Sequence, residues 1–284
     1  MVIAIRPLIG FVLTALMAAP VFANNNASVT SPTSVIQAPK KDGRRWSGFV
    51  SASRSTNLVN HDDGTQSDVM DYLARLNLKL TNNFSLRVQG GYSQDLKDAQ
   101  NDDFSNTSVS LRRAPFDLNQ SFKGTYRVGM IAPTSKDAYK RQNLLTGVTA
   151  GGDLMINPDR LITGLDILGG VSVTRNFHQY ETALDGAVNT QYSSSQMVSI
   201  SYSFESGIAL SATFTHMNTW SYQNVMRDSF DFSQEIGYDI SPSFNIAAGH
   251  TNSGSTLRPN GTDSNVKLLD EESSLIYASA TFVF

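Results

Sequence analysis

The feature that most constrains this chain is an alternation of apolar and polar residues with period two, which returns in segment after segment from Trp46 onward. In the segment 72–80, apolar side chains stand at every even position, while Arg75 and Lys79 stand at odd positions. This period predicts β-strands with two different faces. We count about twelve segments of ~9–11 residues, starting near residues 46, 68, 84, 104, 122, 145, 165, 193, 208, 228, 244 and 274.

The connections between these segments alternate in length. Short or middle-length connections lie at 81–83, 115–121, 157–163, 205–207 and 241–243, and longer polar ones at 55–67, 94–103, 133–144, 178–192, 219–228 and 252–273. Transmembrane barrels of bacterial outer membranes have short turns at one end and long loops at the other. The sequence therefore predicts an all-β fold, a closed antiparallel up-and-down transmembrane β-barrel of about twelve strands over residues 45–284.

Aromatic residues gather near both ends of the predicted strands on the face that would meet lipid. Those at the short-turn end are Trp46, Phe84, Phe122, Phe204, Tyr238 and Phe244, and those at the long-loop end are Tyr72, Tyr92, Trp220 and Phe230. Aromatic rings are favoured at lipid–water boundaries. Two girdles of this kind agree with a spanning barrel better than with a soluble sandwich, whose aromatic residues lie more often in the core.

Composition excludes several other classes of protein. Of the 284 residues, 40% are hydrophobic and 17% are charged, and the formal net charge is −3. This balance argues against disorder and gives no reason to expect a nucleic acid as partner. Because the chain has no Cys, thiolate metal sites and disulfides are excluded.

The first 44 residues carry a different pattern. An apolar run after Arg6, ending in Val21-Phe22-Ala23, predicts a signal peptide over 1–23 that is cleaved after Ala23. The alternative is an uncleaved membrane anchor, which the short run and Pro20 disfavour. Residues 24–44 are rich in Asn, Ser and Pro, which predicts a flexible tail in the periplasm.

The last predicted strand carries a family resemblance. The sequence SSLIYASATFVF, with Phe282 and Phe284 on one face, resembles the C-terminal strand of Gram-negative outer-membrane β-barrel proteins, here a small, porin-like one. The resemblance implies that Phe282 and Phe284 form an assembly signal read by the barrel assembly machinery. It further implies export to the outer membrane, where outer-membrane lipid and lipopolysaccharide would be partners.

The opposite face of the strands would line the barrel interior. Its basic residues are Arg75, Lys79, Arg87, Arg112, Lys123 and Arg127, and its acidic residues on a strand across the barrel are Asp231, Glu235 and Asp239. Twelve strands give a diameter of about 24 Å and an opening of about 10 Å between side chains. One interpretation is a porin-like channel for small polar or anionic solutes, since fixed charges in a narrow pore select ions. The other is a closed interior in which these groups pair with one another.

Two further functions remain as alternatives. A non-conducting barrel could act as an adhesin or structural surface protein. An enzyme of the outer-membrane phospholipase type would use a Ser–His–Asn arrangement, for which His216 and His250 lie on the outer face, but an interfacial role for both is favoured. We expect no catalysis, no cofactor and no metal. The acidic loop residues Asp98, Asp102, Asp103, Asp270, Glu271 and Glu272 are interpreted as solvated, and so are His61 and His178.

Overall fold

The computed structural model describes residues 44–58, 66–258, 263–267, 269–270 and 273–284. Within them, twelve long strands each pair antiparallel with the next along the chain, which confirms the predicted fold class. The strands are β1 (Trp46–Asn57), β2 (Asp68–Lys79), β3 (Phe84–Asp95), β5 (Thr107–Arg113), β7 (Phe122–Ala132), β8 (Leu144–Ile156), β9 (Leu165–His178), β10 (Thr190–Ser203), β11 (Ile208–Ser221), β12 (Met226–Ser241), β13 (Phe244–Ser255) and β14 (Ser274–Val283). The expectations for 1–23, 24–43, His61, Glu271 and Glu272 concern residues outside this description.

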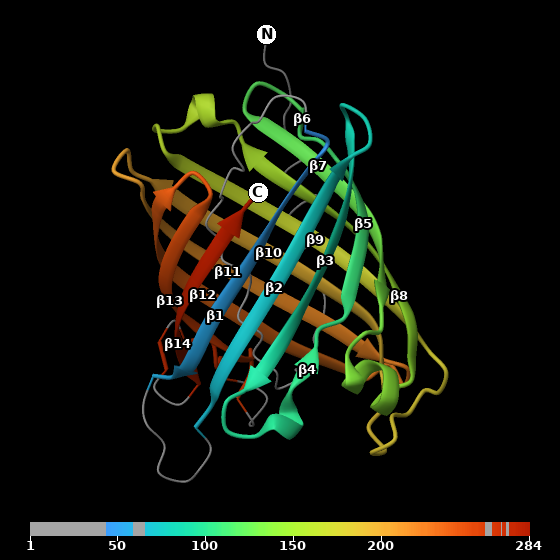
Figure 1. Cartoon of the computed structure of the whole chain (residues 1–284). Coiled ribbons are helices and arrows are strands. Elements are labelled where there is room, and N and C mark those ends of the chain that lie inside the picture. Colours follow the sequence, from blue (N-terminus) through green and yellow to red (C-terminus); the bar gives the residue numbers. More distant parts are fainter. Residues whose placement is uncertain (1–43, 59–65, 259–262, 268, 271–272) are drawn as a thin grey trace.

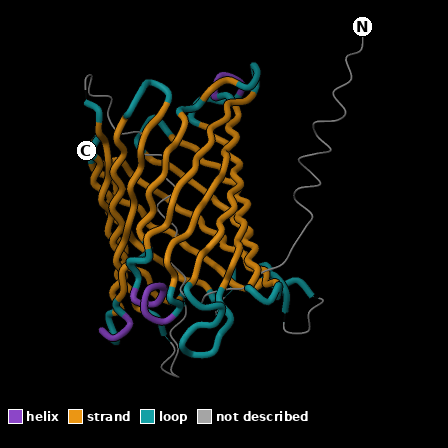
Figure 2. Tube along the Cα trace, turned by 90° about the vertical axis from the view of Figure 1, so that its right-hand side faces the viewer, coloured by secondary structure: helices purple, strands orange, loops and turns teal. Residues whose placement is uncertain are grey.

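The sheet closes on itself, so no long strand is left with an unpaired edge. The first strand, β1, pairs with β2 on one side and with the last strand, β14, on the other, so that Ala52 faces both Tyr72 and Ala280. Figures 1 and 2 show the result as a cylinder of tilted strands. A closed sheet satisfies every backbone donor and acceptor, which is the condition for crossing lipid with strands.

The two faces of the barrel differ as the alternation requires. Outward positions carry exposed apolar side chains, such as Leu76 on β2, Val128 on β7 and Val171 on β9. The positions between them, including Arg75 and Arg127, point inward. No helix in the described residues is long and apolar enough to cross a membrane.

One strand begins later than the sequence indicated. The segment expected from residue 104 is divided into the two-residue strand β4 (Asp103–Phe104) and β5, with Ser105 and Asn106 between them. Side chains hold this interruption, because the Ser105 hydroxyl accepts a hydrogen bond from the Gly91 amide and Thr134 donates to the Ser105 carbonyl. A second short strand, β6 (Phe116–Asp117), pairs with β7 inside a predicted turn.

The expected girdle position of Phe230 is also corrected. The ring is only 2% exposed and stacks on Phe214 at a centroid distance of 6.4 Å. Other predicted girdle residues, such as Trp46, Tyr72 and Tyr238, are exposed at the outer face.

Short helical turns and ion pairs shape the long-loop end. The turns η1 (Ala99–Asn101) and η2 (Asp137–Arg141) lie at the end opposite to the C-terminus, whereas η3 (Pro158–Arg160) lies at the short-turn end (Figures 1 and 2). Arg141 contacts Asp137 in its own turn and Asp185 in the next long loop, and the hydrogen bond that the guanidinium donates to Asp137 raises its pKa. The pKa of Asp185 is lowered first by the hydrogen bond from the Ala187 amide and then by Arg141, so breaking this link by protonation of Asp185 requires a more acidic solution than a free aspartate would.

Candidate functional site

Four arginines on four successive long strands form a continuous basic strip on the inner wall, which we call the arginine ladder. It consists of Arg75 on β2, Arg87 on β3, Arg112 on β5 and Arg127 on β7. Period-two alternation places each of them on the inner face, opposite to exposed outer residues. The sequence predicted all four at this wall, and the structure brings them together on neighbouring strands.

Two members of the ladder are held by neutral amides. Arg75 Nε donates to Gln89 Oε1 at 2.7 Å, and Arg87 Nε donates to Asn77 Oδ1 at 2.8 Å. The Arg75 guanidinium also lies 4.8 Å from the centre of the Phe49 ring. These contacts orient the side chains, but an amide does not cancel a positive charge.

The other two members share a carboxylate that the sequence analysis missed. Arg112 and Arg127 face each other directly across β5 and β7, a position in which like charges destabilise a sheet. Asp153 on β8 compensates, because it accepts from Arg112 at 3.0 Å and from Arg127 at 2.7 and 2.9 Å. The Asp153 side chain is 6% exposed, against 22% and 26% for the two arginines. Parity within the segment that begins near residue 145 indicates the inward position of Asp153, but Asp153 was not among the charged residues predicted for this wall.

A glycine beside the ladder leaves room for these long side chains. Gly151 on β8 is the register partner of Arg127, and it presents no side chain to the interior. A Cβ atom at Gly151 would lie 2.7 Å from the Val171 carbonyl oxygen. The strand can therefore approach β9 closely only with glycine at this position.

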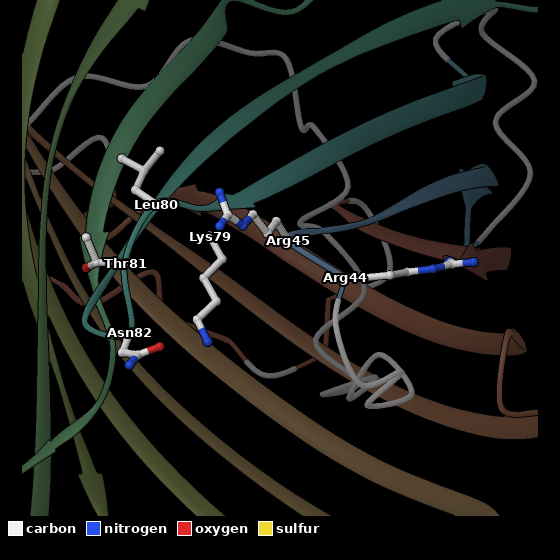
Figure 3. A pocket seen from close by; sticks show the side chains of 6 residues that line it. All are labelled: Arg44, Arg45, Lys79, Leu80, Thr81 and Asn82. Atoms are coloured by element: carbon white, nitrogen blue, oxygen red, sulfur yellow. The ribbon is translucent and has the colours of Figure 1, made fainter.

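The remaining predicted basic residues lie nearer the short-turn end. Lys79 ends β2, and its amide donates to the Arg45 carbonyl. Lys79, Arg45 and Arg44 line a hollow of about 300 Å³ at this end of the barrel. Figure 3 shows Lys79 beside Arg45, with the Arg44 side chain directed away from both. Lys123 lies 4.0 Å from Asp117 in the turn before β7. Arg45 is thus a further cation near Lys79, whereas the Arg44 guanidinium lies 5.3 Å from the centre of the Trp46 ring.

The predicted acidic residues lie along β12, and two of them bind neighbours on their own side of the barrel. Glu235 accepts a hydrogen bond from the Tyr277 hydroxyl of β14 at 3.0 Å, across the intervening strand β13. This contact depends on Gly249, where a Cβ atom would lie 2.4 Å from the Tyr277 ring. Asp239 accepts from Asn245 at 2.9 Å, and Asp231 is buried on the same face.

The order of the strands places the two charged walls on opposite sides of the barrel. The ladder occupies the second to fifth of the twelve long strands, and β12 is the tenth. Within the described residues, neither Asp231 nor Asp239 forms an ion pair with the ladder. The interior therefore combines a basic wall with an acidic one.

Within the described residues, neither outer-face histidine is hydrogen-bonded to a serine hydroxyl. His216 Nδ1 lies 2.7 Å from Gln196 Oε1, and Nε2 contacts Asp228 Oδ1. Both ring nitrogens are thus engaged by groups other than a serine hydroxyl. His250 pairs in register with Gln234 on the outer face, while His178 lies beside the Tyr222 ring. In the loops, Asp102 and Asp103 bind neighbouring residues, including the Tyr92 hydroxyl and the Lys136 amide.

The predicted assembly residues lie at the seam where the barrel closes. Phe284 exchanges two backbone hydrogen bonds with Gly48, at 2.9 and 3.0 Å. Its ring lies 5.7 Å from the Trp46 ring and 6.3 Å from the Phe282 ring. A role for these residues in assembly stays a prediction.

Changing Asp153 to Asn is expected to lower the free energy of unfolding by about 2 kcal/mol, because it leaves two facing arginines without a counterion. Urea unfolding of the refolded protein, followed by the slower gel migration of the unfolded chain, measures this loss. Asp166→Asn is the matched control, since Asp166 is an exposed inner-face carboxylate of β9 without an ion pair in the described residues. Equal stability of the two variants would contradict the role assigned to Asp153.

Comparison with known proteins finds similar structures but no match by sequence. No family model matches the chain, and no curated protein matches its sequence. An outer membrane channel from Pseudomonas putida F1 superposes with a TM-score of 0.57 at 13% identity, covering 84% of this chain and 95% of that one. The NanC porin superposes with a TM-score of 0.54 at 9% identity, covering 83% and 98%. This chain therefore has the closed twelve-stranded barrel fold of outer-membrane channels and porins.

Proposed function

We propose that this protein is a porin-like channel of the outer membrane that passes small anionic solutes by passive diffusion. It is exported with its signal peptide removed, and its short turns face the periplasm. The observation that carries the proposal is the arginine ladder, in which four guanidinium groups and one carboxylate leave three positive charges along the inner wall. Fixed charges on the wall of a narrow pore raise the concentration of ions of opposite sign.

The fold and the contacts of the outer-face histidine His216 favour a channel over an enzyme of the phospholipase type. The two solved structures described above are named as a channel and a porin. The outer-face His216 has both ring nitrogens occupied by Gln196 and Asp228, so it is not placed to deprotonate a serine hydroxyl. We therefore propose that the protein has no hydrolytic activity on lipids.

Single-channel recording of the refolded protein in a planar bilayer tests the proposal. We expect stepwise conductance and, in a KCl gradient, a reversal potential of the sign that indicates preference for chloride. Insertion without conductance would favour the alternative of a non-conducting adhesin or structural barrel. Release of fatty acid from phospholipid in detergent would favour the enzyme.

A further inference from the structure

A groove of about 480 Å³ runs along the outer wall near the long-loop end, across β8, β9, β10 and β11. It forms where small or short side chains on the outer face, Ala150, Val173 and Ser194, lie next to the large rings of Tyr192 and Trp220. Its size falls in the range of sites that hold small molecules. A hollow with apolar lining residues on the lipid-facing side of the barrel can accommodate a lipid acyl chain.

One polar group of the groove, the Ser194 hydroxyl, is already satisfied by the protein. The Ser194 hydroxyl donates to Asn218 Oδ1 at 3.0 Å and accepts from Gln196 Nε2 at 2.9 Å. A hydrocarbon chain lying over Ser194 would therefore leave no donor or acceptor unpaired.

A cation stands at the edge of the groove. Arg175 pairs in register with Val148 on one side and with Tyr192 on the other, on the outer face. Its guanidinium lies 4.9 Å from the Phe177 ring centre and 5.4 Å from the Tyr192 ring centre. Stacking on an aromatic ring uses the face of the guanidinium and leaves its in-plane N–H donors free. In the described residues no carboxylate lies within ion-pair distance of Arg175.

The other arginine on the outer wall at this end is neutralised. Arg54 on β1 forms two hydrogen bonds with the Asp68 carboxylate, at 2.8 and 2.9 Å. Among the residues described, Arg175 is thus the outer-wall arginine at the loop end whose positive charge is not paired with a carboxylate.

We propose that the groove and Arg175 together bind one phosphorylated lipid of the outer leaflet, with an acyl chain in the groove and a phosphate on Arg175. Planar N–H pairs of arginine match phosphate oxygens, and an apolar groove beside them matches the attached chain. The site requires the long loops to face the outer leaflet. It does not require the lumen to conduct, so its failure and the failure of the channel are separate results.

Trp220 reports on the groove, because it lines the groove and the chain contains only one other tryptophan, Trp46. In a Trp46→Phe background, purified protein in detergent is titrated with lipid A carrying its phosphates, and the fluorescence of Trp220 is recorded. We expect a saturable change, and about tenfold weaker binding after Arg175→Gln, as loss of a charge-assisted contact predicts. Ala150→Leu, which fills the groove floor, is expected to weaken binding without altering the charge.

Arg54→Gln serves as the matched control, because it removes an equal charge from the same wall, and it is expected to bind as the parent protein does. Inorganic phosphate alone is expected to leave the fluorescence unchanged. Equal binding of dephosphorylated lipid A, or equal binding by the Arg175→Gln variant, would overturn the proposal. Slower gel migration after heating verifies that each variant is folded.

Discussion

In a KCl gradient, replacing Arg75, Arg87, Arg112 and Arg127 together by Gln is expected to abolish the anion preference that we propose for this protein. The substitutions remove the four positive charges of the ladder and leave Asp153 and the acidic residues of β12 in place. The reversal potential of single channels measures the change. We expect it to move from the chloride side to zero or to the potassium side.

The size of the effect follows from Coulomb's law. The Coulomb interaction energy between one unit charge and an ion about 10 Å away in water is about 0.4 kcal/mol. Screening at 0.1 M salt, where the Debye length is ~10 Å, lowers this by about a factor of three. The three net charges of the ladder with Asp153, taken without the acidic wall of β12, then favour an anion over a cation by roughly fivefold. At 1 M salt the Debye length is ~3 Å, so the preference is expected to shrink there.

A smaller variant separates selectivity from stability. Arg75→Gln with Arg87→Gln leaves Asp153 and its two arginines intact, and it is expected to lose part of the anion preference. Arg113 lies on the outer face, where it is the register partner of Phe84. Arg54→Gln with Arg113→Gln therefore removes two charges from the outer face, and we expect this variant to keep the selectivity of the parent protein. Cation preference in the parent protein, or no change in the fourfold variant, would show that other charges govern entry.

The strands were predictable because the alternation of apolar and polar residues within each segment distinguishes its two faces. In β2, for example, the alternation of Leu76 and Leu78 with Asn77 and Lys79 identifies the outer face without knowledge of any partner strand. Closure was predictable too, since lipid excludes an open sheet edge. These inferences depend on local pattern and on one general physical constraint.

What the sequence did not reveal depends on contacts between distant segments. Asp153 joins the ladder only because β8 is paired with β7, which places its carboxylate beside Arg112 and Arg127. Phe230 is buried by neighbours, although its parity alone predicted exposure to lipid. The interruption before β5 depends on hydrogen bonds from other strands and loops. Such features become visible only when the register of the sheet is known.

Changing Phe284 to Lys is expected to reduce the amount of closed barrel in the outer membrane severalfold. Phe284 lies where β14 meets β1. These are the last and first strands of the chain, and their pairing closes the barrel. The substitution removes the ring contact with Trp46, worth about 1 kcal/mol. It also places a cation beside the aromatic girdle at the short-turn end. If β1 and β14 separate, backbone groups along both strands lose their partners, and each unpaired group in lipid costs several kcal/mol. The folded fraction is measured as the band that migrates faster on unheated gels.

Tyr238→Lys is the matched control for the seam. Tyr238 is an exposed aromatic residue of β12 at the short-turn end, and β12 keeps both of its neighbours whatever happens between β1 and β14. A charge at this level of the lipid face costs about 0–1 kcal/mol by itself, so the control is expected to assemble nearly normally. Equal losses in the two variants would attribute the effect to a lysine in the girdle and not to the seam. A double-mutant cycle of Trp46→Leu and Phe284→Leu then isolates the contact itself, and we expect a coupling of about 1 kcal/mol between the two rings.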